Sequence, residues 1–306
     1  MKLVIFGCGN IAHRIAKSCK LVEGLELVGF ASKDIDKAKQ YSQLYECKKY
    51  GDYDYFLNSD VDAVYIATYN NSHYDLIKKC LENRKNVICE KPMLFDSKQI
   101  NEMFDLAKAN NVLLMEALKS VFLPIIIKTK QMIKDKTIGE IKSIYASFMR
   151  NGNHDDNHWI NIKETGGALK DLGSYTIGTM NYLMDVNPEI ISIETNETDT
   201  KADTIAHVEL RYGNVIGKSS VSNSIDKDTY LLVEGDKGYI KIDNFWKSGN
   251  GEYEVNGIKH ELNEECISDF YYELKHFKDL VDNKIIESPI MSKKRSLDII
   301  KITNKE

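Results

Sequence analysis

A short stretch of the chain combines an acid, a base and a proline at the point where an apolar run ends. Residues 87–92 read VICEKP, and the first three are typical of a buried β-strand. Pro92 has no backbone N–H to donate and cannot continue a central strand. The Lys91 ammonium is therefore expected at the carboxyl edge of a sheet, where open α/β sheets bind their ligands.

A second candidate pair lies in residues 166–175, which read GGALKDLGSY. Asp171 and Tyr175 are four residues apart within a helical pattern of apolar residues, so both are expected on one helix face, one turn apart. A phenol has a pKa of about 10, and a nearby ammonium lowers that pKa so that the phenolate can accept a proton. The alternative for Tyr175, among 17 tyrosines, is a packed aromatic on an amphipathic helix.

The first residues predict the element that would hold a cofactor. Residues 3–6 form a continuous apolar run, typical of a parallel strand buried on both faces. They lead into the fingerprint G-x-G-x-x-[GA], followed by a helical pattern. The glycines permit a tight turn and the close approach of a pyrophosphate, and the helix start offers free N–H groups. The alternative is a glycine-rich turn without a ligand. The predicted cofactor contacts of this loop are Gly7, Gly9, Asn10, Ile11 and Ala12.

The end of the second predicted strand, over residues 25–30, indicates which dinucleotide is bound. An NAD-binding unit usually carries Asp or Glu there to hold the ribose hydroxyls. Here Ser32 and Lys33 stand instead, and a hydroxyl and a cation suit a 2′-phosphate. We therefore expect NADP as the cofactor, with NAD as the less favoured alternative. A solvated turn lysine is the alternative for Lys33, and the nearby Asp34 and Asp36 oppose the NADP interpretation.

A polar loop follows the next predicted strand. Thr68, Asn70 and His73 are expected to contact the cofactor at the same sheet edge, as are Glu90 and Lys91. Helix capping is the alternative for Asn70 and His73.

Strands and helices alternate up to about residue 117, which predicts a doubly wound parallel sheet of the α/β class. The later sequence changes to strands with period-two alternation and glycine-containing junctions. Residues 1–118 are therefore predicted to form a dinucleotide-binding domain, and residues 119–306 a substrate-binding and oligomerisation domain. The strands expected in the second domain are 141–149, 190–194, 204–212, 215–221, 230–234 and 238–242, and an amphipathic helix over 268–281 closes it.

Three motifs together resemble the glucose–fructose oxidoreductase/inositol dehydrogenase (Gfo/Idh/MocA) superfamily. They are the glycine fingerprint at 7–12, the EKP motif at 90–92 and the GGALKDLGSY motif at 166–175, in the family's order along nearly the whole chain. The resemblance implies a Rossmann domain, then an α+β domain with a large, mostly antiparallel sheet. It also implies a cis bond before Pro92.

The last motif, with Tyr rather than His at 175, is similar to the branch of dihydrodiol dehydrogenases and NADP-dependent D-xylose dehydrogenases. The MEA at 115–117, followed by Phe122 and Pro124, is similar to the same branch. The aromatic and the arginine usual between these anchors are missing, because Lys119-Ser120-Val121 stand there. This departure affects the substrate rather than the fold.

The resemblance implies an NAD(P)-dependent dehydrogenase or reductase acting on the CH–OH group of a sugar, polyol or cyclic diol. In this interpretation Tyr175 is the acid/base, Lys91 lowers the pKa of Tyr175, and Asp171 orients Lys91 or binds a substrate hydroxyl. Family members bury an apolar sheet face against a partner, so a homodimer or higher homo-oligomer through the C-terminal sheet is expected.

Two other functions compete with this one. An NAD-dependent inositol-type dehydrogenase would keep the fold, but Tyr175 rather than His and the Ser32-Lys33 pair oppose it. A non-catalytic nicotinamide-binding sensor is opposed by the intact Lys91, Asp171 and Tyr175.

Composition excludes several classes of protein. The net charge of −5 over 306 residues argues against a nucleic-acid surface, which needs clustered excess cation. No stretch approaches the roughly 20 apolar residues of a membrane span, and the apolar run at the N-terminus is too short for a signal peptide. The six cysteines show no ligand-like spacing, so a reducing cytoplasm is expected.

A loop before the glycine pair contains His154, Asp155, Asp156, His158 and Trp159. Two histidines with two carboxylates suggest a metal site, but no helix or CxxC frame fixes their spacing. We expect this loop to form part of the substrate-pocket wall, without a metal.

Overall fold

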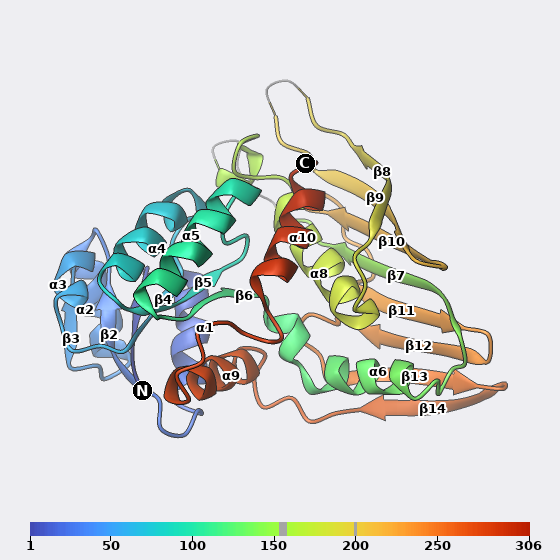
Figure 1. Ribbon diagram of the computed structural model, residues 1–306, viewed down its shortest axis with the longest axis horizontal. Helices are drawn as coiled ribbons and strands as arrows, with labels where there is room; N and C mark the ends of the chain where they lie inside the picture. Colours follow the sequence, from blue (N-terminus) through green and yellow to red (C-terminus); the bar gives the residue numbers. More distant parts are fainter. Residues whose placement is uncertain (153–157, 199–200) are drawn as a thin grey trace. The chain divides into compact units, whose positions relative to one another are not determined.

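The computed structural model describes residues 1–152, 158–198 and 201–306 (Figure 1). The chain forms two compact units, Met1–Ala117 with Phe270–Ser296 and Leu118–Asp269 with Leu297–Glu306. This division differs from the predicted 1–118 and 119–306, because a late segment belongs to the first unit. The reason is helix α9 (Tyr271–Asp282), whose apolar face packs against α1 (Asn10–Cys19) of the first unit.

The first unit contains a six-stranded parallel sheet with the order β3-β2-β1-β4-β5-β6. The order reverses between β1 and β4, as in a doubly wound fold, in which ligands bind outside the carboxyl ends of the strands at this point. The strands are β1 (Lys2–Phe6), β2 (Glu26–Ala31), β3 (Lys49–Gly51), β4 (Ala63–Ile66), β5 (Asn86–Glu90) and β6 (Leu114–Ala117). The helices between them are α1, α2 (Ile35–Leu44), α3 (Tyr53–Leu57), η1 (Asn70–Ser72), α4 (His73–Glu82) and α5 (Ser97–Asn110).

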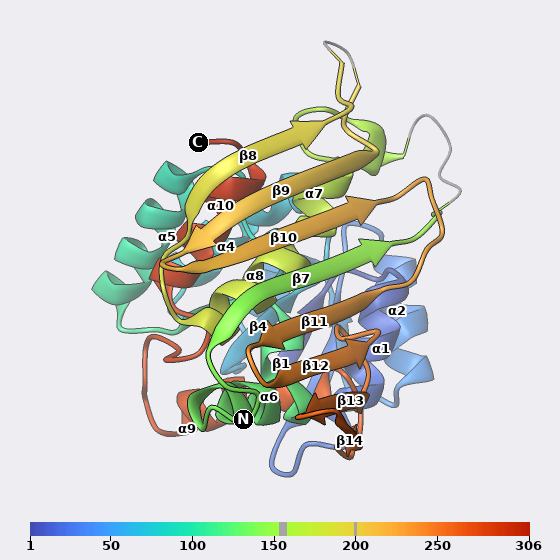
Figure 2. The same cartoon turned by 90° about the vertical axis from the view of Figure 1, so that its right-hand side faces the viewer.

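The second unit is organised on an eight-stranded sheet with the order β14-β13-β12-β11-β7-β10-β9-β8, which Figure 2 shows face-on. Every neighbouring pair is antiparallel except β7 and β10. The α/β fold with a second, mostly antiparallel sheet is therefore confirmed. The strands are β7 (Ile141–Met149), β8 (Glu189–Thr195), β9 (Ile205–Tyr212), β10 (Val215–Ser222), β11 (Tyr230–Gly235), β12 (Gly238–Asp243), β13 (Asn250–Val255) and β14 (Ile258–Asn263).

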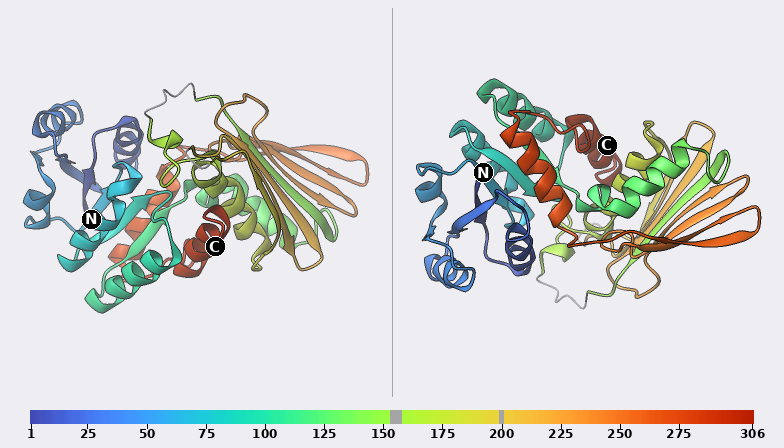
Figure 3. Two further views of the ribbon diagram at one scale, coloured as in Figure 1. Left: turned by 90° about the horizontal axis from the view of Figure 1, so that it is seen from above. Right: turned by 90° about the horizontal axis from the view of Figure 1, so that it is seen from below.

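Helices of the second unit lie on one face of this sheet (Figure 3). Helix α8 packs directly on β7 and β10. Gly178 allows α8 to lie close to Leu118, because a Cβ there would lie 2.4 Å from Leu118 Cδ2. Polar contacts fix α8, including Thr176 Oγ1 to Ser219 Oγ at 2.6 Å. The helices are η2 (Lys119–Phe122), α6 (Pro124–Lys134), η3 (Trp159–Asn161), α7 (Ala168–Asp171), α8 (Gly173–Met184) and the end of α10 (Lys293–Thr303). Among the residues the structure describes, no helix is long and apolar enough to cross a membrane.

Candidate active site

The loop between β1 and α1 has the geometry of a phosphate-binding turn. Gly7 has a φ of +110°, and a Cβ there would lie 2.5 Å from the Ala67 carbonyl oxygen, so only glycine fits. A Cβ on Gly9 would meet no atom within 4 Å. The loop thus closes tightly against β4 at Gly7 and opens outward at Gly9.

The start of α1 fits an anionic ligand. Gly9 is its N-cap, and no side chain caps the helix. No acidic residue lies in its first turn, so the helix dipole there is not neutralised by a carboxylate. Ala12 is fully buried, Ile11 half-buried and Asn10 exposed. The main-chain N–H groups at this end fit the pyrophosphate of a dinucleotide.

The turn after β2 carries the predicted readers of the cofactor's ribose. Ser32 is half-buried and Lys33 is exposed. Asp34 is the N-cap of α2, and its Oδ1 accepts the Lys37 backbone N–H at 3.0 Å. The Ser32 hydroxyl accepts the Asp34 backbone N–H at 3.1 Å. Asp34, whose charge opposed the NADP interpretation, is therefore engaged in starting the helix.

Sequence reasoning missed Lys37, Tyr41 and Tyr53 in this region. Burial raises the pKa of the Cys8 thiol to about 11, and the charge of Lys37 acts against that rise, so Lys37 lies near the glycine loop. The Tyr41 hydroxyl donates to the Gly9 carbonyl at 3.3 Å. Tyr53 packs on Phe6, with ring centroids 4.9 Å apart. Their only sequence signal was their position in α2 and at the start of α3.

His73 joins the ends of β4 and β5. Its fully buried ring places Nδ1 3.1 Å from the Pro92 carbonyl oxygen and 3.2 Å from that of Met93. Its Nε2 lies 3.3 Å from the Thr68 carbonyl oxygen. Thr68 also contacts Ser72, with their hydroxyl oxygens 2.7 Å apart, while Asn70 is 7% exposed. This arrangement favours a role for His73 in holding two site loops together rather than in touching the cofactor.

We expect His73 to make stability depend on pH. Burial lowers the pKa of His73 in the folded chain, so below pH about 6.5 the unfolded chain binds more protons. The free energy of unfolding should therefore decrease as the pH is lowered through that range. His73 contributes at most about 1.4 kcal/mol to this decrease for each pH unit. Urea denaturation at pH 7.5 and 5.5 measures the slope. It should be smaller in His73→Gln and unchanged in the exposed control His260→Gln; equal slopes in wild type and His73→Gln contradict the assignment.

The Lys91–Pro92 peptide bond at the end of β5 is cis, as the resemblance implied. Glu90 accepts a hydrogen bond from the Tyr65 hydroxyl at 2.8 Å, and the same hydroxyl oxygen lies 3.1 Å from Glu273 Oε1. Tyr65 and Glu273 are fully buried, and burial with both carboxylates raises the pKa of Tyr65. The Tyr65 hydroxyl therefore joins the end of β5 to α9 within the first unit.

Glu116, of the MEA segment, supports the chain just after Lys91. Its Oε1 accepts the Met93 backbone N–H at 3.1 Å, and the residue is 5% exposed. Burial raises the pKa of Glu116, and the Lys91 charge acts against that rise. The loop that carries Lys91 is therefore held by His73, Glu90 and Glu116.

In the second unit, Asp171 and Tyr175 lie on either side of a helix junction. The single helix expected here is divided at Leu172 into α7 and α8, although Leu172 keeps helical dihedral angles. Ser174 explains the break, because its hydroxyl donates to the Lys170 carbonyl at 2.7 Å in competition with the backbone. Asp171 and Tyr175 thus stay about one turn apart.

Aromatic side chains surround Tyr175, which is 8% exposed. Its ring centroid lies 5.7 Å from that of Phe148 and 5.9 Å from that of Trp246. Phe148 and Trp246 stack on each other, with centroids 5.2 Å apart. Sequence reasoning missed both partners, since each comes from a strand or strand end far along the chain. We call Phe148, Tyr175 and Trp246 the aromatic wall.

The predicted loop of His154, Asp155 and Asp156 lies outside the described residues. Of its other members, His158 Nδ1 accepts the Ile160 backbone N–H at 3.3 Å, and the rings of His158 and Trp159 lie 5.5 Å apart. Within the described part of the chain, no three His, Cys, Asp or Glu side chains group as metal ligands.

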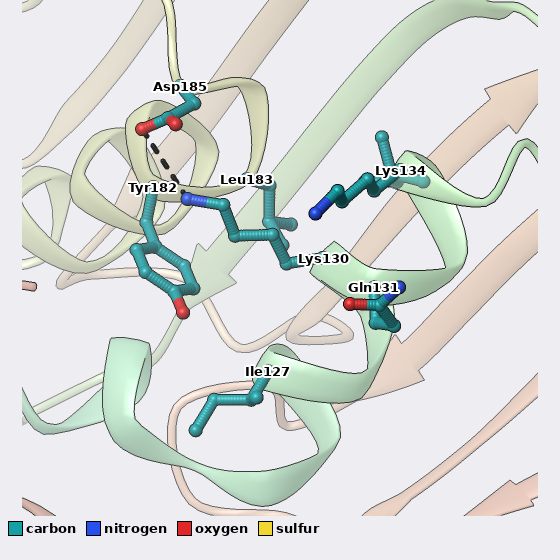
Figure 4. Close-up of a pocket in the computed structure, with 8 residues that line it drawn as sticks. Ile127, Lys130, Gln131, Lys134, Tyr182, Leu183 and Asp185 are labelled. Carbon is teal, nitrogen blue, oxygen red and sulfur yellow. Dashed lines mark ion pairs between the residues drawn. The ribbon is translucent and has the colours of Figure 1, made fainter.

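A hollow of about 450 Å³ lies between α6 and the end of α8 (Figure 4). In it, Lys130 Nζ pairs with Asp185 Oδ1 at 3.4 Å and lies 4.2 Å from the Tyr182 ring centroid. None of the predicted site residues lines this hollow. It is lined by Ile127, Lys130, Gln131, Ile133, Lys134, Tyr182, Leu183 and Asp185.

Comparisons with known proteins agree with this geometry. The chain is 29% identical to trans-1,2-dihydrobenzene-1,2-diol dehydrogenase of Xenopus laevis, over 87% of this chain and 84% of that protein. Its fold matches KijD10, a 3-ketoreductase from Actinomadura kijaniata solved with NADP and TDP-benzene, at a TM-score of 0.90, 22% identity and coverage of 99% and 96%. It also matches an aldose-aldose oxidoreductase from Caulobacter crescentus, at a TM-score of 0.90, 20% identity and coverage of 100% and 96%.

Two family models cover most of the chain. An oxidoreductase family model with an NAD-binding Rossmann fold matches residues 1–118. The GFO/IDH/MocA C-terminal domain model matches residues 126–241. With the parallel sheet, the open glycine loop and the second sheet in place, the chain belongs to the GFO/IDH/MocA family of NAD(P)-binding oxidoreductases.

Proposed function

We propose that this protein is an NADP-dependent dehydrogenase or reductase that acts on a CH–OH group of a sugar, polyol or cyclic diol. The observation that carries the proposal is the uncapped start of α1, open in front of Gly9 at the same sheet edge as Lys91. The relatives named as diol dehydrogenases and the structural neighbours named as ketoreductase and aldose oxidoreductase support the reaction class.

The residues that hold the dinucleotide in this proposal come from four strand ends. The glycine loop binds the pyrophosphate, and the loops after β4 and β5 line the nicotinamide side. The bound cofactor supplies the hydride acceptor or donor. The proposed contacts are Gly7, Gly9, Asn10, Ile11, Ala12, Ser32, Lys33, Thr68, Asn70, Glu90 and Lys91. His73 holds the loops after β4 and β5 together and makes no proposed contact with the dinucleotide.

Tyr175 is the proposed acid/base. Oxidation of an alcohol requires loss of the hydroxyl proton, and the Tyr175 oxygen accepts it; in reduction the Tyr175 hydroxyl returns it. The Lys91 ammonium stabilises the phenolate and so lowers the pKa of Tyr175. Asp171 orients Lys91 or binds a substrate hydroxyl. The proposal requires the two units to present these groups to one bound substrate.

The experiment that tests the function is a turnover assay at the nicotinamide absorbance. The panel contains aldoses, inositols and trans-dihydrodiols, each with NADP⁺ and with NAD⁺. Turnover of at least one class supports the proposal. NADPH binding, followed by tryptophan fluorescence, without any turnover supports a sensor instead, and absence of both overturns the cofactor assignment.

Ser32 and Lys33 should set the preference for NADP over NAD. A charge-assisted hydrogen bond to the 2′-phosphate contributes about 1.5–3 kcal/mol, or roughly ten- to a hundredfold in affinity. Ser32→Ala, which removes only the hydroxyl, should lower kcat/KM for NADP⁺ by that factor and leave kcat/KM for NAD⁺ within about threefold. Asp36→Asn, on the exposed side of α2, is the control. Equal losses for both cofactors would assign Ser32 to the structure of the turn.

The open face of the second sheet supports a homodimer. No helix of the described residues covers this face (Figures 2 and 3). Leu232 pairs with Tyr145 across β11 and β7, and both are only half-buried. We expect light scattering after gel filtration to give twice the chain mass of 35.0 kDa, and Leu232→Glu to shift the mass toward the monomer. A wild-type mass of one chain removes this proposal.

A further inference from the structure

Lys119 is a buried cation beside the aromatic wall. Its side chain is 2% exposed and pairs with the Asp269 carboxylate, whose side chain is 14% exposed. The Lys119 ammonium also lies 4.4 Å from the Trp246 ring centroid, within cation–π range. Lys119 stands in the segment where the resembled branch of the family carries an aromatic and an arginine.

The pair lies one ring away from the proposed acid/base. Trp246 contacts both Lys119 and Tyr175. The ring centroids of Trp246 and Tyr175 lie 5.9 Å apart. Phe148, the third member of the aromatic wall, contacts the rings of both Tyr175 and Trp246. All five residues belong to the second unit, so this cluster is defined within one compact body. A substrate hydroxyl bound at the pair would lie near the group that reacts, and would be a different hydroxyl.

Stability alone does not explain the pair. Removing two charges from water is costly, and apolar residues of similar volume are often as stable or more stable in their place. The pair does offer a hydrogen-bonding surface, because Asp269 keeps part of its side chain exposed while Lys119 is buried behind it. A carboxylate held by a buried ammonium is a fixed acceptor for a hydroxyl O–H.

We propose that Lys119 and Asp269 form a specificity site that accepts a substrate hydroxyl beyond the reacting one and its vicinal neighbour, so that the preferred substrate is a polyhydroxylated ring such as a pyranose. This inference rests on the proposed function and names its substrate class. Asp269 accepts the hydrogen bond, and Lys119 is a positioning residue that fixes the carboxylate. A dihydrobenzene diol carries only the reacting hydroxyl and its vicinal neighbour, so it has no more distant hydroxyl for the carboxylate once water is excluded.

The test compares two substrates in wild type and in the double variant Lys119→Met/Asp269→Leu, which removes both charges and leaves no lone buried ion. The probes are D-xylose or D-glucose and trans-1,2-dihydrobenzene-1,2-diol, each with saturating NADP⁺. In the variant, kcat/KM for the aldose should fall about ten- to a hundredfold, mostly through KM, while kcat/KM for the diol changes less than about threefold.

A matched control lies in the same unit. Lys130 and Asp185 also form an ion pair with the cation over an aromatic ring, Tyr182, in the hollow of Figure 4. Lys130→Met/Asp185→Asn should leave both values of kcat/KM unchanged. Melting temperatures and NADPH binding of both double variants show whether they are folded.

The outcomes separate the inference from the proposed function. An aldose preference in wild type that is reduced in the double variant supports the inference. A wild type that prefers the diol, or an aldose-to-diol ratio that the variant leaves unchanged, overturns the inference and leaves the dehydrogenase function intact. Oxidation of neither probe nor of any polyol in the panel overturns the proposed function, and the inference with it.

Discussion

Tyr175→Phe is expected to lower kcat by about 10²- to 10⁴-fold, the usual contribution of a general acid/base, while NADPH binding stays within about twofold. The substitution keeps the ring that packs against Phe148 and Trp246 and removes one oxygen. The free energy of unfolding should change by about 1 kcal/mol or less. The measurement is steady-state turnover with NADP⁺ and the best substrate of the panel, with thermal unfolding of the same samples.

Tyr182→Phe is the matched control for this experiment. Tyr182 lies on the same helix, is 7% exposed, and contacts Lys130 rather than the aromatic wall. Turnover near the wild-type value in the Tyr182 variant, with collapse in the Tyr175 variant, assigns the proton to Tyr175. Undiminished turnover in Tyr175→Phe means that another group moves the proton, and Asp171 and Lys91 are then the candidates for the acid/base.

The parts of the fold that the sequence predicts well carry local signals. The glycine loop, the apolar parallel strands and the helices between them are each readable within about ten residues. Strand β7 has the predicted bounds, Ile141–Met149. Strands β13 and β14 were missed, since their largely polar residues are exposed or half-buried and lack a clear period-two apolar pattern.

The parts that the sequence did not predict depend on long-range contacts. Tyr65 and Glu273 are 208 residues apart, and Lys119 and Asp269 are 150 apart. No local sequence pattern brings either pair together. The Tyr65–Glu273 contact requires α9 to pack in the first unit, and the Lys119–Asp269 contact requires the two ends of the segment 118–269 to lie together in the second unit. The same return explains why the division into units differs from a single boundary near residue 118.

His73 shows a different limit. The sequence placed it in the polar loop after β4 and left cofactor contact and helix capping as its roles, whereas it is the first residue of α4. The structure shows it fully buried, with both ring nitrogens facing main-chain carbonyl oxygens of two loops. A residue type and a loop position do not determine which way a side chain points, and burial decides it here. Direct contact with the cofactor stays a prediction for Thr68 and Asn70.

The two glycines of the phosphate loop are expected to respond to substitution in opposite ways. Gly7→Ala should destabilise the fold by several kcal/mol, because the φ of +110° is strained for alanine and its Cβ would collide with the Ala67 carbonyl oxygen, so a drop in melting temperature is expected even without cofactor. Gly9 has a φ of −110° and open space where a side chain would stand, so the fold should tolerate substitution there.

Gly9→Asp is the sharpest form of this prediction, because stability and binding should move in opposite directions. Asp is a better N-cap than glycine, so the free energy of unfolding should rise by a few tenths of a kcal/mol. The added carboxylate would occupy the place of the pyrophosphate and repel it, so the Kd for NADPH should rise by about a hundredfold or more. Gly9→Asn caps the helix without a charge, and the difference between the two variants isolates electrostatic repulsion from loss of space. A Kd that stays at the wild-type value in Gly9→Asp would mean that no phosphate approaches the start of α1, and the cofactor assignment would then have no physical basis in this loop.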